Sequence, residues 1–412
     1  MKFRFNYLCY VACAISIIIL IVEFIDTIRF YSALLQNNIF YYSGYKIQEL
    51  INKEPGFREM QAGALVKKIS KLFRELFAWF LLTMLLFTVT NSRMKECANR
   101  MCQYKMNVLG TRSLNCNRAE INFICVFLTT CLFAAYGNAF VRAIGKDFDT
   151  IASEAVFYVM IFTIVLPFIM ALFYNLFRIF GSKLIIAFYL TFYIKATAEF
   201  FTQEDVDLLT FKKVEISQYS KAVQEYLTER SLQDRVYHER EKSDSINAAL
   251  VGWGAYEHIE IYGDHKEFSN EEFESVLMHE IGHSQDYSLY KKVLALYVIK
   301  AIEFAVVWWL WNSAAEFYSN ETLTKTGAFF VLVIIYEMYL NRYLMVLHKL
   351  TSQNAEINAD LIAKKHGFAE NLGKVLFKIT VKSKEPIHYT FWYNALKSFH
   401  PSILRRVEYL HK

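Results

Sequence analysis

Long apolar runs are the feature that most constrains how this chain can fold. A helix needs about 20 apolar residues to cross the hydrocarbon core of a bilayer, and the 412-residue sequence has seven runs near that length. They lie at residues 7–25, 72–90, 121–141, 155–177, 182–201, 293–315 and 326–347. A hydrophobic share of 55% and a positive mean hydropathy (+0.20) are both high for a soluble domain of this size. The sequence therefore predicts an all-α polytopic membrane protein with seven transmembrane helices.

The first apolar run resembles a signal peptide because it follows Lys2 and Arg4. The residues after it, Glu23-Phe24-Ile25-Asp26, offer no small-residue cleavage site. We therefore expect this run to be retained as the first span.

Ionisable side chains occur inside three of the predicted spans, where burial of charge in lipid is costly. They are Lys195, Lys300, Glu303, Glu337 and Arg342. We expect them to face the interior of the helix bundle or a water-filled cavity. Lys300 and Glu303 stand three residues apart on one helical face and are predicted to pair.

Charged residues are sparse in several long runs and crowded between residues 202 and 292, so the net charge of +5 describes no single surface and predicts no nucleic-acid partner. The stretch from Thr202 to about Glu241 has no run long enough to cross a bilayer and is expected to be soluble. Residues 248–253 and 257–264 are predicted as two short strands around a glycine-containing turn, which form a small β-hairpin.

The hairpin is followed by a metal-binding pattern, His279-Glu280-Ile281-Gly282-His283. Ser269 and Glu272 form a capping box before it, which predicts that both histidines lie on one helix. Histidines four residues apart on a helix point the same way and can share one zinc ion, with the glutamate beside the open coordination position. The pattern predicts one Zn²⁺ per chain, bound by His279 and His283, with Glu280 as general base.

A catalytic zinc requires a third protein ligand, and Glu356 is the best candidate. Asp360 follows one helical turn later on the same face and could accept a hydrogen bond from a ligand histidine. A solvated acidic helix face is the alternative for this segment. Near the C-terminus, His400 and Arg406 could stabilise an oxyanion, although a His-Pro sequence before a basic helix is by itself typical of a turn and a helix start.

These residues, in this order, resemble the type I CAAX prenyl endopeptidases, seven-span membrane zinc proteases that process prenylated proteins. The resemblance runs through Ser245-Ile246-Asn247-Ala248, the HExxH motif, the segment 356–360, His400-Pro401 and Arg406. The chain departs from the family at Gln353-Asn354, where a basic pair is usual.

The resemblance implies a role for each matching residue. His279, His283 and Glu356 would bind zinc, Glu280 would be the base, and Asp360 would support a ligand. Asn247 and Ala248 would lie on an edge strand that receives substrate as an added strand. His400 and Arg406 would contact the scissile carbonyl or the product carboxylate. The family also implies a chamber enclosed by the seven helices, prenylated CAAX substrates, and the endoplasmic reticulum or nuclear membrane.

The predicted organisation has four segments. Residues 1–201 hold spans one to five, and 202–291 form the soluble, gluzincin-like zinc-protease segment. Residues 292–350 hold spans six and seven, and 351–412 carry the third ligand and the C-terminal catalytic residues. The predicted activity is removal of the C-terminal tripeptide of prenylated CAAX proteins. The alternatives are a membrane quality-control zinc protease and a non-enzymatic transporter or scaffold with an incidental metal site.

The sequence alone does not fix the membrane orientation, glycosylation or disulfide bonding of the chain. The basic loop after the second span favours a cytosolic position by the positive-inside rule, whereas the resemblance implies a lumenal one, which we follow. The loop between spans six and seven would then be lumenal, and Asn320-Glu321-Thr322 there is a glycosylation sequon. In an oxidising lumen, one disulfide among Cys97, Cys102 and Cys116 is possible.

Overall fold

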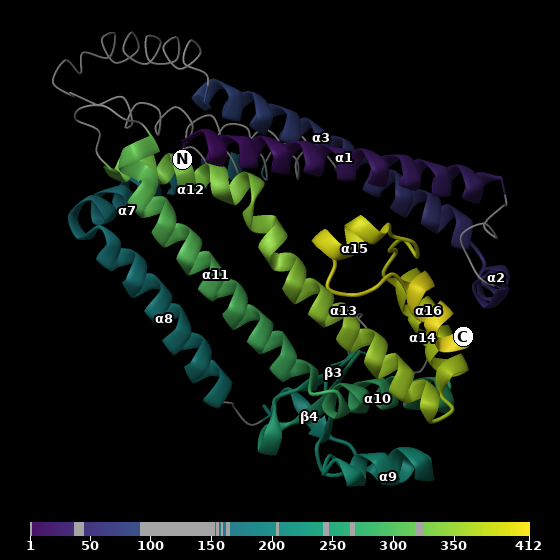
Figure 1. Cartoon of the computed structure of the whole chain (residues 1–412). Helices are drawn as coiled ribbons and strands as arrows, with labels where there is room; N and C mark the ends of the chain where they lie inside the picture. The colour runs from purple at the N-terminus through teal and green to yellow at the C-terminus, as the bar shows by residue number, and fades with distance from the viewer. Residues whose placement is uncertain are drawn as a thin grey trace. The chain divides into compact units, whose positions relative to one another are not determined.

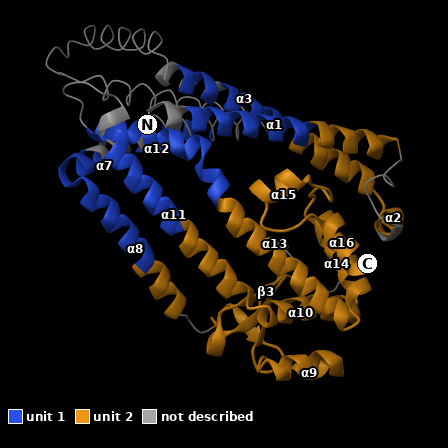
Figure 2. Cartoon of the chain, in the orientation of Figure 1, with its two compact units in different colours: residues 1–24, 69–193, 300–344 blue, residues 25–68, 194–299, 345–412 orange. Residues whose placement is uncertain are grey.

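The computed structural model describes residues 2–36, 45–90, 153, 156–157, 160–161, 165–202, 206–241, 247–263, 268–317 and 325–412 (Figure 1). The third predicted span, the sequon at Asn320, and Cys97, Cys102 and Cys116 lie outside this part of the chain. The chain divides into two compact units (Figure 2). Unit 1 comprises residues 1–24, 69–193 and 300–344, and unit 2 comprises residues 25–68, 194–299 and 345–412.

Unit 1 is built from parts of long apolar helices. They are α1 (Lys2–Leu35), α3 (Phe57–Thr90), α7 (Leu166–Phe180), α8 (Ser182–Phe201), α11 (Ser288–Phe317) and α12 (Lys325–Tyr339). Its core joins α1, α3, α7, α11 and α12 through large side chains such as Leu20, Trp79, Phe177, Trp311 and Phe329. Aromatic packing of this kind brings a large apolar area out of contact with solvent at each ring.

The prediction of seven spans is met only in part. In the part of the chain that the structure describes, three helices are long and apolar enough to cross a membrane, Tyr7–Leu35, Ser182–Phe201 and Ser288–Ala314. A fourth exists if α12 and α13 (Asn341–Lys365), which meet at 43°, form one bent span. The predicted second span lies within α3, where Arg74 and Glu75 leave an apolar run shorter than about 20 residues. Of the predicted fourth span, only its end is described as a regular helix, in α7.

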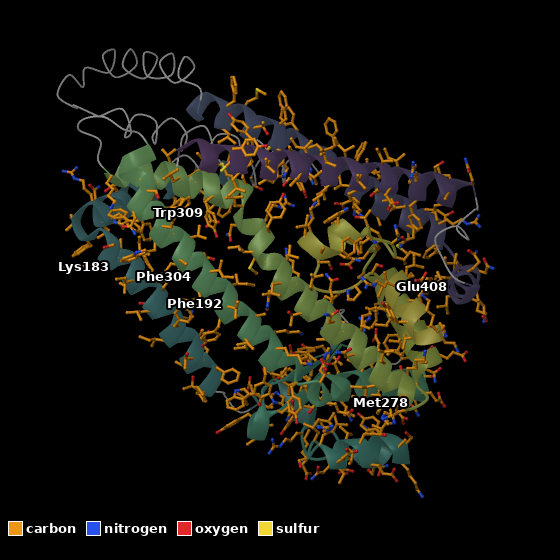
Figure 3. All side chains as sticks on the ribbon, viewed as in Figure 1. Lys183, Phe192, Met278, Phe304, Trp309 and Glu408 are labelled. Carbon is orange, nitrogen blue, oxygen red and sulfur yellow. The ribbon has the colours of Figure 1, made fainter. Side chains whose placement is uncertain are left out.

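The charges in the sixth predicted span behave as expected. The Lys300 ammonium donates to Glu303 at 2.8 Å, and the Tyr189 hydroxyl of α8 donates to the same carboxylate at 2.8 Å. Figure 3 shows that aromatic side chains, including Phe192 and Phe304, fill the space between α8 and α11 beside this pair. The predicted Lys300–Glu303 pair is thus confirmed, and it is stabilised by a hydrogen bond from the neighbouring helix.

Unit 2 contains a four-stranded sheet where the sequence predicted only a hairpin. The strands are β1 (Phe211–Lys213), β2 (Val236–Glu239), β3 (Asn247–Val251) and β4 (His258–Tyr262), in the order β1-β2-β4-β3. The predicted hairpin is β3 and β4, which pair antiparallel around a short turn at Gly254–Tyr256. The description all-α is therefore wrong in detail, since unit 2 contains this sheet. The sequence does not predict β1 and β2, because they lie within the charged stretch 202–241, where such short strands show no clear alternation of apolar and polar residues.

Besides the sheet, unit 2 contains several helices, including those that carry the predicted site. They are α2 (Tyr45–Lys53), α9 (Lys221–Glu229), α10 (Asn270–Gln285), α14 (Ala369–Lys382), α15 (Phe391–Lys397) and α16 (Ile403–His411), together with α13. A buried core unites α9, β2, β4, α10 and α14 through side chains such as Leu227, Val236, Ile259, Leu277 and Leu372. This core fixes α10 beside the edge strand β3 (Figure 1).

The start of α10 follows the predicted capping box. The Ser269 hydroxyl accepts a hydrogen bond from the Glu272 amide, and the Glu272 carboxylate accepts one from the Ser269 amide. The Glu272 carboxylate also accepts two bonds of 2.8 Å from Lys378 of α14. The beginning of the helix is thus held both by its own cap and by a neighbouring helix.

Candidate active site

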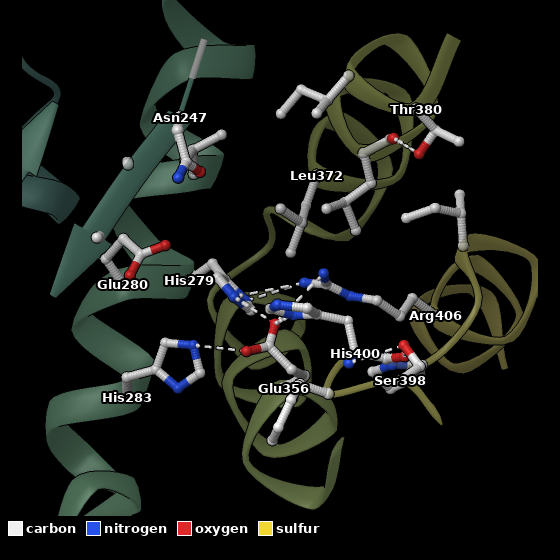
Figure 4. Close-up of a pocket in the computed structure, with 18 of the residues that line it drawn as sticks. Asn247, His279, Glu280, His283, Glu356, Leu372, Thr380, Ser398, His400 and Arg406 are labelled. Carbon is white, nitrogen blue, oxygen red and sulfur yellow. Dashed lines mark hydrogen bonds and ion pairs between the residues drawn. The ribbon is translucent and has the colours of Figure 1, made fainter. Parts of the chain in front are cut away.

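A group of three potential metal ligands lies where α10 faces α13. His279 and His283 occupy successive turns of α10, and Glu356 of α13 lies opposite them (Figure 4). One ligand atom from each residue lies within 4.8 Å of the others. The Nε2 atoms of both histidines are 3.5 Å from oxygen atoms of the Glu356 carboxylate. The structure therefore brings the three predicted ligands together from two helices.

The geometry and chemistry of these residues fit one zinc ion. Two ligand atoms that are each about 2.0–2.1 Å from a tetrahedral ion lie about 3.4 Å apart, close to the measured 3.5 Å. Two imidazoles and one carboxylate are also a set that leaves one coordination position open for water or substrate. The side chains of His279, His283 and Glu356 are 7%, 11% and 7% exposed, respectively, so the site is largely buried but still in contact with solvent.

Asp360 and Arg406 contact the potential metal ligands and support their positions. The Asp360 carboxylate lies 3.0 Å from Nδ1 of His279, on the opposite side of the ring from Glu356. A hydrogen bond at Nδ1 leaves Nε2 free to bind metal and fixes the ring orientation. The Arg406 guanidinium donates twice to Asp360, at 2.7 and 2.8 Å, and lies 3.4 Å from Glu356. All of these groups are buried, so a single cation joins both carboxylates of α13.

Glu280 lies between the histidines and the edge of the sheet. Its carboxylate accepts a hydrogen bond of 2.9 Å from the backbone amide of Leu250 in β3. Burial, reinforced by the nearby Glu356 and opposed by His279, raises the pKa of Glu280 to about 7. A carboxyl group whose pKa lies near neutrality can both accept and return a proton.

The two histidines occupy different electrostatic surroundings. Burial, together with the nearby His279, lowers the pKa of His283 to about 3, so His283 is the neutral imidazole that a metal requires. At His279, burial lowers the pKa, but hydrogen bonds with Asp360 and Glu356 outweigh this and raise it to about 9. The carboxylates around His279 thus favour positive charge at this point, whether it comes from a proton or from a metal ion.

The outer edge of β3, with which no strand of the described residues pairs, faces the site. In the antiparallel pair with β4, alternate residues point their amide and carbonyl groups away from the sheet. Leu250 is one of these, since its amide donates to Glu280, and Ala248 is therefore another. Ala248 is buried and Asn247 is exposed, and both line the same cavity as the three ligands. The structure places both predicted substrate residues beside the metal-binding group.

His400 and Arg406 are also brought to this group, but in different ways. The His400 side chain is 67% exposed, and its Nδ1 lies 3.4 Å from Glu356. The Arg406 side chain is only 7% exposed and is occupied by Asp360. His400 is thus free to reach a bound substrate, whereas Arg406 is engaged in holding the acidic residues of α13.

The cavity has a volume of about 910 Å³ and extends well beyond the predicted residues. One wall is apolar and comes from α14, with Leu372, Leu376 and Ile379. Another contains Tyr389 and Tyr393. No signal in the sequence identified either wall, because apolar residues at helical spacing and isolated tyrosines are typical of any packed helix.

Comparisons with known proteins agree with this geometry. The model of Peptidase family M48 matches residues 219–412. A comparison with curated proteins finds no match. Among solved structures, the crystal structure of S. mikatae Ste24p is similar over 98% of this chain and 99% of that chain, with a TM-score of 0.54 and 16% sequence identity. The M48 match includes both helices that carry the potential metal ligands, and the structural match covers nearly the whole chain.

Proposed function

We propose that this chain, a membrane metalloendopeptidase with an M48 peptidase domain at residues 219–412, is a zinc enzyme that removes the C-terminal tripeptide of prenylated CAAX proteins. The proteolytic part of the proposal rests above all on one observation. Glu280 lies between the His279–His283–Glu356 group and the outer edge of β3, with which no other described strand pairs. A peptide added to that edge would pass directly over the base and the metal ligands.

Each residue of the site has its own role in the proposed hydrolysis of the peptide bond. His279, His283 and Glu356 would hold one zinc, which when bound lowers the pKa of water and polarises a carbonyl group. Glu280 takes a proton from the attacking water and returns one to the leaving amine. His400, exposed at the cavity, donates to the oxygen of the scissile carbonyl as negative charge develops there. Asp360 and Arg406 keep His279 and Glu356 in place.

The edge strand accounts for binding of an extended peptide. Ala248 offers its amide and carbonyl groups, and the Asn247 side chain lies beside it at the mouth of the cavity. Main-chain hydrogen bonds of this kind bind many sequences, while side-chain pockets select among them. The apolar α14 wall would accept an aliphatic side chain of the substrate.

The prenylated substrate is supported by three observations together. The chain resembles type I CAAX prenyl endopeptidases at residues that the structure gathers in one cavity. Its fold resembles that of Ste24p along almost the full length of both chains. Its long apolar helices would lie in the bilayer, where a prenyl chain also partitions. Seven spans around a chamber and residence in the endoplasmic reticulum membrane belong to this same proposal.

The test is mass spectrometry of a farnesylated CAAX peptide incubated with the purified chain. The enzyme with zinc should release the terminal tripeptide, while chelator and Glu280→Gln should each abolish release. The same peptide without its farnesyl group, and a denatured soluble protein, serve as control substrates. Equal cleavage of the control substrates would favour a quality-control protease, and bound zinc with no cleavage of any substrate would favour a transporter or scaffold.

A further inference from the structure

One wall of the active-site cavity is a short segment before and within α15. Glu385, Pro386, Tyr389 and Tyr393 from this segment all line the cavity. The rings of Tyr389 and Tyr393 stack with their centroids 4.5 Å apart and an angle of 11° between their planes. Most of this wall is loop, and a loop keeps a fixed position only if its backbone and side chains are held from outside.

The backbone of the wall is held by Gln61 of α3. The Gln61 side chain is completely buried. Its amide nitrogen donates to the carbonyl of Glu385 at 2.7 Å, and its oxygen accepts from the amide of Ile387 at 3.2 Å. One side chain thus bonds to two backbone groups that lie two residues apart, of which the Ile387 amide is buried. Loss of Gln61 would leave the buried Ile387 amide without this acceptor, which is costly.

The tyrosines of the wall are held by Lys68, two turns further along α3. Lys68 is 8% exposed, and its ammonium lies 4.7 Å from the ring centre of Tyr389 and 4.6 Å from that of Tyr393. Cations within about 6 Å of an aromatic face are attracted to it, most strongly when they are removed from water. A single cation therefore contacts both rings of the stacked pair.

These contacts are part of a larger packed region. One core joins Phe30, Leu34, Phe57 and Leu65 of the N-terminal helices to Ile387, Leu404 and Val407 near the C-terminus. Asp26 of α1 also lies 2.9 Å from the His388 ring. All of these residues belong to unit 2, so the N-terminal stretch 25–68 packs within the same unit as the active site. It lies outside residues 219–412, which match the peptidase family.

We propose that Gln61 and Lys68 are positioning residues of the peptidase: they hold the Tyr389–Tyr393 wall, and an apolar part of the bound substrate lies against its stacked rings. The N-terminal helices thereby help to form the substrate site and do more than anchor the chain. The substrate contact rests on the proposed peptidase function, whereas the holding contacts do not.

The first test measures hydrogen exchange of the wall by mass spectrometry in Gln61→Leu. The Ile387 amide loses its acceptor in this variant, so peptides that cover residues 384–393 should exchange faster, with α10 unchanged. Gln48→Leu is the matched control, because Gln48 is another buried glutamine of unit 2 that donates to Asn52 within its own helix. Unchanged exchange of the wall in Gln61→Leu would overturn the proposal.

The second test measures peptide cleavage. Gln61→Leu and Lys68→Met should each raise KM about 3- to 10-fold with little change in kcat, as expected when binding alone is weakened. Lys68→Arg should restore the KM because it keeps the cation over the rings. Gln48→Leu should leave both constants unchanged. Equal losses in Gln61→Leu and Gln48→Leu, or loss of kcat alone, would show that Gln61 serves folding only and would overturn the proposal.

A double-mutant cycle shows whether the effect passes through the wall. If Gln61 acts by placing the tyrosines, Tyr393→Ala should raise KM, and adding Gln61→Leu to it should cause little further change. Effects that multiply would contradict the proposal. If the wild-type enzyme cleaves no prenylated peptide, the proposed substrate is wrong, and the hydrogen-exchange result then decides whether Gln61 holds the wall.

Discussion

Gly282 of α10 lies directly against the backbone of Ala359 in α13. A Cβ atom at position 282 would lie 2.9 Å from the Cα and 3.0 Å from the carbonyl oxygen of Ala359. Only glycine permits this approach, which sets the distance between the helix that carries the two histidines and the helix that carries Glu356. Helix packing thus requires glycine at position 282, although the HExxH motif itself sets no residue there.

Gly282→Ala should weaken metal binding and destabilise the protein. The added methyl group meets main-chain atoms, which cannot turn aside as a side chain can, and overpacking of this kind typically costs about 1–3 kcal/mol. Zinc competition against a chelator and thermal unfolding in detergent would measure the two effects. Gly63→Ala is the control, since no atom of the described residues outside its own turn of helix lies within 4 Å of the added methyl group. Equal metal affinity in both variants would refute the role given to this contact.

Asp360→Asn should reduce metal affinity while leaving the three ligands in place. The carboxylate accepts from Nδ1 of His279 and from Arg406, and removal of such a supporting group typically costs about 10- to 100-fold in metal affinity or activity. The measurement is a zinc competition titration. Asp234→Asn, which affects only an exposed pair with Lys213, should leave the affinity unchanged. A similar loss in Asp234→Asn would indicate a general effect of removing acidic charge.

Arg406→Lys should lower activity although the positive charge is retained. Lysine cannot reproduce the two parallel hydrogen bonds that the guanidinium makes to Asp360. We expect weaker zinc binding and a lower kcat/KM, measured on the same preparations. Arg405→Lys is the neighbouring control, because Arg405 lies over the Tyr409 ring and not among the buried acids. Full activity of Arg406→Lys would mean that charge alone is sufficient at this position.

Ser269→Ala should destabilise the start of the metal-binding helix. The loss of an N-cap hydroxyl typically costs about 0.5–2 kcal/mol, and Ser269 caps the Glu272 amide. Thermal unfolding in detergent would measure the shift. Ser220→Ala is the matched control, since Ser220 stands at the N-cap of α9 but makes no side-chain cap bond. If both variants unfolded at the same temperature as the wild type, the capping box would not contribute to stability.

The grouping of the potential metal ligands could be predicted from sequence because the spacing of the two histidines follows from helix geometry. His279 and His283 share a face at any place in the fold, and the capping box marks the helix that carries them. Glu356 required a further step, since nothing local distinguishes it from a solvated acid. Glu356 is predicted because a catalytic zinc ion needs a third protein ligand besides the two histidines.

The support of the site could not be predicted because it depends on contacts between distant segments. The resemblance implies that Arg406 contacts the scissile carbonyl or the product carboxylate, which stays a prediction; that its guanidinium also donates to Asp360, 46 residues away, could not be predicted. Gln353, at a departure from the family pattern, donates to the carbonyls of Asn394 and Ser398 and so fixes α15. Gln61 lies more than 300 residues from the loop that it holds. Local periodicity carries no information on such pairs.

The central claim is that His279, His283 and Glu356 bind one zinc ion that Glu280 uses without binding it. The most direct measurement is the zinc content of purified wild-type, Glu280→Gln and Glu356→Gln chains after dialysis against a weak chelator, by inductively coupled plasma mass spectrometry. We expect one zinc per chain in the wild type and in Glu280→Gln, and strong depletion in Glu356→Gln. Full zinc content in Glu356→Gln, or none in the wild type, would contradict the account.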